Sequence, residues 1–147
     1  MKQKEIEKNN LDFIINISKF NMVLSKALDS KLWWLWFNDF IVLYHLNKAN
    51  DQKLKRIELA EKVWLTASGI TRLLLPMEKI WLVSKEINSS DARISYVSIA
   101  SGWKTKFEEA LERLNFFTEE TIDKDQAKKL NDLTKILQKI WWKMMWK

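Results

Sequence analysis

The side chains best suited to specific recognition lie between Thr66 and Arg72 and share one side of a predicted helix. Thr66 is a favourable N-cap, because its hydroxyl can accept hydrogen bonds from the unpaired amides of the first turn. Residues three or four positions apart lie on the same helical face, and this face carries Ala67, Ser68, Thr71 and Arg72. Small or hydroxyl-bearing side chains beside one long cation suit contact with base edges in a DNA major groove, which is about 12 Å wide.

The segment before this helix predicts a helix-turn-helix. Leu59, Ala60 and Val63 mark the apolar side of a shorter first helix. Ala60 and Ile70 stand where two such helices need a small residue and a branched apolar residue in order to pack across each other. Many helical pairs share this spacing by chance, so the prediction also depends on the next segment.

Two strand-like runs follow, at residues 82–87 and 94–99, and both are rich in β-branched residues. The polar residues between them suit a hairpin loop, so we predict a wing beside the helix-turn-helix. Arg93 can reach a narrow minor groove or a phosphate, with Asp91 orienting its guanidinium. The loop residues Ser89 and Ser90 are further candidates for DNA contact. An ordinary surface hairpin with an internal ion pair is the alternative.

The charge of the chain fits a polyanionic partner. The formal net charge is +6, and residues 53–93 contribute +3 of it, from eight basic and five acidic side chains. A basic reading segment is typical of nucleic-acid binding, although it does not prove it. Lys53 and Lys55, together with Arg56, precede the motif and can either bind phosphate groups or form a solvated charge run.

The middle third of the chain contains the segments IELAEKV (57–63), LTASGITRL (65–73), MEKI (77–80), LV (82–83) and DAR (91–93). In order and separation they resemble the MarR family of bacterial winged-helix transcription regulators, whose pattern runs from ELA through S-x-x-T-R-L and LEKxGLV to D-x-R at the wing. The resemblance implies a homodimer that binds double-stranded DNA at a pseudo-palindromic operator and often responds to a small molecule.

We expect one mainly α domain of about six helices with a small β-hairpin wing. Apolar spacings predict further helices over residues 4–29, 38–50, 104–117 and 124–140. Residues 36–100 would form the winged helix-turn-helix. The resemblance implies that residues 1–32 and 101–147 are dimerisation helices.

The resemblance also implies a small aromatic or acidic effector bound between the dimerisation helices and the DNA-reading part. Candidate pocket residues come from the first two predicted helices, and they are Phe13, Ile17, Phe20, Tyr44 and His45. An apolar stripe at helical spacing is more often plain core. The single histidine lacks the partners that a catalytic base or a metal ligand needs, so a structural or pocket-lining role is expected.

Several function classes are disfavoured. There is no cysteine, which excludes disulfides and thiolate metal sites. No nucleophile pair, metal-ligand cluster or phosphate-binding glycine loop indicates an enzyme, and no cofactor or metal is expected. The first ten residues are charged, and no apolar run approaches the roughly 20 residues that span a bilayer. We therefore expect a cytoplasmic protein without a membrane partner. A winged-helix protein interaction module that does not read DNA is the alternative function.

The chain has only two glycines but nine tryptophans. Trp81 follows the second motif helix, where a left-handed residue is usually glycine. Trp64 lies in the turn between the motif helices and Trp103 lies after the wing, and at all three the family resemblance leads us to expect glycine. We hypothesise a glycine-to-tryptophan altered form of a natural regulator, by design or through an error in the recorded sequence, against the alternative of a naturally tryptophan-rich chain. The tryptophans are Trp33, Trp34, Trp36, Trp64, Trp81, Trp103, Trp141, Trp142 and Trp146.

Overall fold

The computed structural model describes the backbone of residues 2–145, so Trp146 lies outside the described residues. Its elements, with two short 3-10 helices at Asn50–Gln52 and Ser101–Trp103, follow in chain order: α1 (Lys2–Leu32), α2 (Phe37–Lys48), β1 (Lys53–Lys55), α3 (Arg56–Lys62), α4 (Ala67–Lys79), β2 (Val83–Ile87), β3 (Ser95–Ile99), α5 (Lys104–Thr121) and α6 (Lys124–Met145). The prediction of a mainly α chain with a small wing is confirmed. No helix among the described residues is long and apolar enough to cross a membrane.

The strands form one antiparallel sheet in the order β1-β3-β2. β2 and β3 make the wing, with Val83 opposite Ile99 and Ile87 opposite Ser95. β1 pairs with the other edge of β3, where Lys53 faces Ser98. Sequence analysis missed β1, because a three-residue strand is too short to show the alternation that identifies strands.

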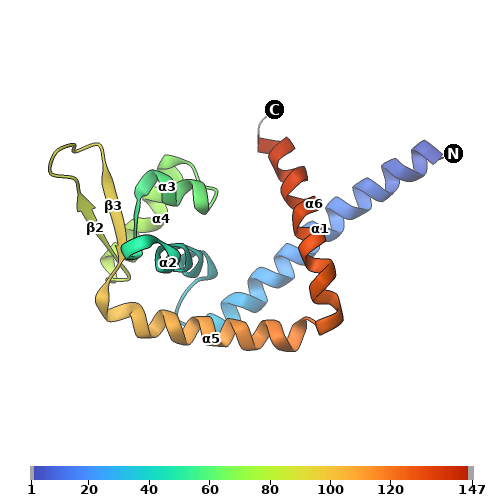
Figure 1. The fold of residues 1–147 in the computed structure, drawn as a ribbon. Coiled ribbons are helices and arrows are strands. Elements are labelled where there is room, and N and C mark those ends of the chain that lie inside the picture. The colour runs from blue at the N-terminus through green and yellow to red at the C-terminus, as the bar shows by residue number, and fades with distance from the viewer. Residues whose placement is uncertain (1, 146–147) are drawn as a thin grey trace.

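The core lies where the motif helices meet α2, β3 and α5. Ala60 and Ile70 are both buried, as the helix-turn-helix spacing predicted. The largest fully buried side chains come from several elements, and they include Phe107, Leu32, Leu43, Leu46, Leu59, Met77, Leu82 and Val97. Figure 1 shows α2, α3, α4 and the sheet gathered at one side of the molecule, while α1, α5 and α6 extend away from them.

Two tryptophans occupy left-handed positions at helix ends, with φ of 57° at Trp64 and 63° at Trp81. After α3, the amide of Trp64 donates to Glu61 O (3.3 Å) and that of Leu65 to Ala60 O (2.9 Å). After α4, Trp81 and Leu82 repeat this pattern with Glu78 and Met77, at 3.0 and 2.9 Å. Both are Schellman motifs, in which the left-handed residue is usually glycine. The backbone therefore supports the expectation of glycine at these two positions.

Trp103 has a different backbone. Its φ is −109°, which any residue adopts, so the backbone does not require glycine there. Its ring instead stacks on that of Trp34, with centroids 5.8 Å apart.

Replacing Trp81 with glycine is expected to raise the free energy of unfolding by about 1 kcal/mol. Relief of the left-handed conformation contributes about 1–2 kcal/mol, and the added freedom of the unfolded chain offsets about 0.4–1 kcal/mol of it. The side chain of Trp81 is 77% exposed, so little packing is lost. Urea denaturation measures the change.

Trp36→Gly is the matched control, because Trp36 is 70% exposed but has φ of −71°. It gains no conformational relief and should lower stability slightly. Equal effects of the two substitutions would contradict the assignment of strain to Trp81.

Candidate nucleic-acid interface

The start of α4 is fixed by the predicted cap. Thr66 Oγ1 accepts a hydrogen bond from the amide of Gly69 at 3.0 Å, which confirms Thr66 as the N-cap. The hydroxyls of Thr66 and Ser68 lie 3.2 Å apart. One of the unpaired donors of the first turn is thereby satisfied.

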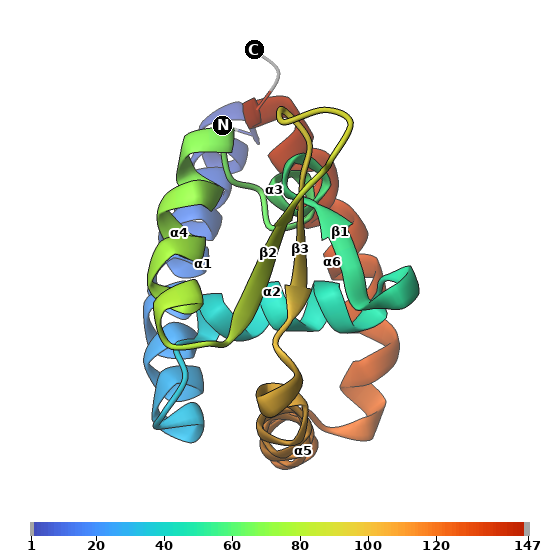
Figure 2. The same cartoon turned by 90° about the vertical axis from the view of Figure 1, so that its left-hand side faces the viewer.

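One face of α4 is exposed along its length. Ile70, Leu74 and Met77 are buried against the core, whereas Ser68 and Arg72 are exposed. The exposed face also includes Ala67, Leu75, Pro76 and Lys79. Figure 2 shows α4 running beside the β2–β3 hairpin, with the start of α4 and the hairpin loop at the same end of the molecule. The candidate contacts of the helix and the wing are therefore presented together.

Thr71 lies at the edge of this face and is partly buried. Its hydroxyl donates to Ala67 O at 2.9 Å and accepts from Nη1 of Arg56 at 2.5 Å. The hydroxyl hydrogen is therefore already used within the protein. Sequence analysis did not assign this contact, because Arg56 and Thr71 are 15 residues apart and meet only when α3 packs against α4.

In the wing loop, backbone amides donate hydrogen bonds to two side chains, those of Asn88 and Asp91. Asn88 Oδ1 accepts from the amides of Ser90 (2.8 Å) and Asp91 (3.1 Å). Asp91 Oδ1 accepts from the backbone amide of Arg93 at 2.9 Å. Asp91 thus orients the backbone at Arg93, whereas we had expected it to orient the guanidinium. Ser89 is exposed at the tip of the same loop.

The basic residues before α3 have different surroundings. Nζ of Lys53 lies 2.5 Å from Glu86 Oε2 and 4.7 Å from the centre of the Tyr96 ring, so Lys53 is held on the sheet. Lys55, by contrast, lines a hollow of about 80 Å³ together with Arg56 and Arg93. Lys53 is therefore paired with a carboxylate, whereas Lys55 lines a hollow with two other cationic residues.

The five predicted effector-pocket residues are not all brought together. His45 lines a cavity of about 590 Å³, and its ring contacts that of Tyr44, with centroids 5.7 Å apart. Phe13 and Ile17 on α1 are partly buried and Phe20 is exposed, and none of the three lines this cavity. The other lining residues come from α3, the turn after it and α6, and they are Ala60, Glu61, Lys62, Trp64, Leu65, Thr66 and Trp142.

His45 lies in a setting that disfavours its charged form. Burial, and then the charges of Lys62 and Lys48, hold its pKa below the usual value of 6.5. The imidazole is therefore expected to be neutral at pH 7. As a separate point, no group of three or more histidine, cysteine, aspartate or glutamate side chains among the described residues could hold a metal ion.

The lowered pKa of His45 predicts a pH dependence of stability. Because the folded protein binds the proton less readily than the unfolded chain, stability is full above pH 6.5 and falls as the pH drops through 6.5 toward the folded pKa. His45→Gln should remove this component. Urea denaturation of both proteins between pH 7.5 and 5.5 tests it, and identical pH dependence in the two proteins would contradict the assignment.

No protein-family model and no curated protein sequence matches this chain. Solved structures of the same fold are numerous. The chain is similar to AbsC, a MarR family transcriptional regulator from Streptomyces coelicolor, with a TM-score of 0.76, 16% identity, and coverage of 89% of this chain and 93% of that one. For the transcriptional regulator BldR from Sulfolobus solfataricus, the TM-score is 0.73 at 26% identity, covering 89% and 96%. Sco3205 is a MarR family transcriptional regulator from Streptomyces coelicolor that was solved in complex with DNA. The chain is similar to it with a TM-score of 0.73 and 18% identity, and the match covers 88% of this chain and 85% of that one.

Proposed function

We propose that this chain, which has the winged helix-turn-helix fold of MarR family regulators, is a sequence-specific DNA-binding transcription regulator that acts as a homodimer. One observation carries the proposal: the polar and cationic start of α4 is exposed at the same end of the molecule as the wing loop. A helix that enters the major groove beside a wing needs both of these elements to face the duplex together. Such a regulator acts in the bacterial cytoplasm, where its operator lies.

Within this interface, the side chains have separate roles. Ser68 and Arg72 contact base edges, since both are exposed on the outer face of α4. Thr66 and Ala67 lie at the groove entrance, at the first turn of the helix. Thr71 can meet a base through its methyl group, because its hydroxyl hydrogen is donated to Ala67. The wing residues contribute from the adjacent part of the duplex, and they are Ser89, Ser90, Asp91 and Arg93.

The homodimer is supported by apolar surface that the single chain leaves uncovered. In α6, Leu130, Leu133 and Leu137 follow the spacing of a core-facing stripe. However, the buried core of the described residues contains no side chain from this 22-residue helix. Large apolar residues of α1 are also exposed, among them Leu11, Phe20, Met22 and Val23. A second copy would cover both helices, and it would place two α4 helices roughly 34 Å apart, one turn of duplex.

A small aromatic or acidic effector is the regulatory part of the proposal. It would bind in the cavity beside His45, because this cavity lies between the α3–α4 turn and the end of α6, which the rings of Trp64 and Trp141 bring together. Its walls are largely apolar and aromatic, with one cation from Lys62 and one carboxylate from Glu61, so they suit an aromatic ligand best, and an acidic group on it would pair with Lys62. An effector bound in this cavity would change the position of α4 relative to α6.

Selection from a pool of random duplexes tests the proposed function. The protein should enrich a pseudo-palindromic sequence, and its affinity should fall steeply with salt because phosphate contacts release counterions. The alternative, a protein interaction module, is favoured by the modest charge of residues 53–93. Recovery of no enriched sequence, together with a protein partner whose binding is insensitive to salt, would favour that alternative.

A further inference from the structure

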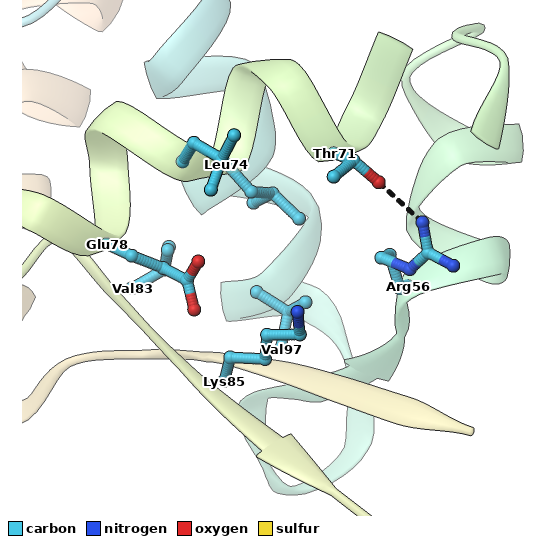
Figure 3. A pocket seen from close by; sticks show the side chains of 8 residues that line it. Arg56, Thr71, Leu74, Glu78, Val83, Lys85 and Val97 are labelled. Atoms are coloured by element: carbon cyan, nitrogen blue, oxygen red, sulfur yellow. Dashed lines mark hydrogen bonds between the residues drawn. The ribbon is translucent and has the colours of Figure 1, made fainter. Parts of the chain in front are cut away.

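Arg56 links the start of α3 to the recognition helix α4. Its Nη1 donates to Thr71 Oγ1 at 2.5 Å and to Ala67 O at 3.2 Å. Figure 3 shows the guanidinium reaching from α3 toward Thr71 beside a small apolar pocket whose walls include Leu74, Val83 and Val97. A guanidinium has five N–H donors, so these two contacts fix its position and leave donors for a further partner.

Arg56 also lines a hollow at the junction of α3 and the wing. The hollow measures about 80 Å³, and three cations and one hydroxyl line it, from Lys55, Arg56, Arg93 and Ser95. No carboxylate is among the lining residues. In the described part of the chain, none of the three cations forms a salt bridge. Nearby Glu58 accepts from the backbone amide of Lys55 at 3.1 Å. An anion that enters this hollow would meet three cationic residues and no carboxylate.

We propose that Lys55, Arg56 and Arg93 bind one backbone phosphate of duplex DNA, and that Thr71 positions Arg56 for this contact. The inference rests on the proposed function, because the anion is a phosphodiester of the duplex that α4 and the wing contact. Arginine suits this role, since its planar donors match phosphate oxygens. Arg93 is thereby assigned to a phosphate and not to the minor groove.

The proposal gives Thr71 a role that differs from base recognition. Its hydroxyl cannot donate to the acceptors of guanine, because the hydrogen is given to Ala67 O. Thr71 Oγ1 instead accepts a hydrogen bond from Arg56, and this contact sets the position of the guanidinium relative to α4 and thereby to the bound phosphate. Loss of this hydroxyl should therefore weaken binding to every sequence equally.

The salt dependence of binding tests the phosphate contact. The probe is a fluorescent 30-base-pair duplex of mixed sequence, and its affinity is measured by anisotropy over a series of NaCl concentrations. Removing Lys55, Arg56 and Arg93 together to alanine should lower the slope of log K against log[salt] by about 1 per bound subunit, because the slope counts phosphates and not cations. Each single substitution should lower it by less. A loss of about 3 would instead indicate three separate phosphates and would overturn the shared site.

The control removes the same charge elsewhere. Lys104, Lys106 and Lys128 are exposed on α5 and at the start of α6, which Figure 1 places far from the wing loop. Their combined replacement by alanine should leave the slope unchanged. An equal loss in both triple variants would reduce the effect to net charge and would overturn the site. If the unaltered protein binds no duplex at low salt, the proposed function itself fails.

A double-mutant cycle tests the positioning role of Thr71. Thr71→Val and Arg56→Ala should weaken binding of the duplex by similar factors, and the double variant should be no weaker than Arg56→Ala alone. Arg56→Lys, which keeps the charge but loses the planar donors, should also remain sensitive to salt while binding more weakly. Additive losses would show that Thr71 acts independently of Arg56 and would overturn its assigned role. Circular dichroism melting confirms that each variant is folded.

Discussion

Replacing Leu133 with glutamate is expected to weaken the proposed homodimer by roughly 100-fold or more, because each of the two subunits contributes one such carboxylate. Leu133 is 39% exposed and lies in the apolar stripe of α6 between Leu130 and Leu137. A carboxylate buried without a partner at an interface costs about 3 kcal/mol or more, and every 1.4 kcal/mol is tenfold in an equilibrium constant. Sedimentation equilibrium should show mainly monomer at concentrations where the unaltered protein is dimeric.

Asn131→Glu provides the matched control, because it adds the same charge to the same helix. Asn131 is exposed and is turned well away from the stripe, given the rotation of 100° per residue in a helix. This variant should remain a dimer. Dissociation by both substitutions would indicate a general effect of charge on α6, and dissociation by neither would remove α6 from the interface.

Arg72→Ala is expected to cost about 1–3 kcal/mol in binding to the selected operator and to relax the preference at one base pair. Arg72 is exposed on α4, so its side chain is accessible to a base edge. Arginine paired to guanine O6 and N7 is the commonest specific contact in the major groove. Affinities for the operator and for single-base-pair variants of it measure both effects.

Two results would alter the role of Arg72. Equal losses on all duplexes would make it a phosphate contact, since such contacts carry no sequence information. No loss on any duplex would place it outside the interface. Lys104→Ala, which removes a cation beyond the far end of β3, should leave both affinity and sequence preference unchanged.

Features that depend on local sequence could be predicted well. The N-cap at Thr66 depends only on a hydroxyl three residues before an amide. The left-handed residues Trp64 and Trp81 directly follow the two motif helices, at positions where the family resemblance leads us to expect glycine. The burial of Ala60 and Ile70 follows from the periodicity of two adjacent helices. In each case the determining contacts lie within a few residues or within one motif.

Features that depend on distant partners could not be predicted. β1 exists because Lys53, Leu54 and Lys55 pair with a strand more than 40 residues away. The ion pair of Lys53 with Glu86 joins residues 33 positions apart, so the sequence did not indicate it. The contact of Arg56 with Thr71 likewise requires the packed helix pair. Charge and residue type identify such side chains as candidates, whereas only the fold decides which of them have partners within the protein.

Hydroxyl-radical footprinting on the DNA that flanks the gene for this chain tests the central claim most directly. The account predicts two protected segments on one face of the duplex, related by a pseudo-dyad, with centres about 34 Å or roughly ten base pairs apart. Protection of a single unsymmetrical segment would contradict the paired arrangement of reading helices. Uniform protection along the whole duplex, with no defined footprint at any protein concentration, would contradict sequence-specific recognition.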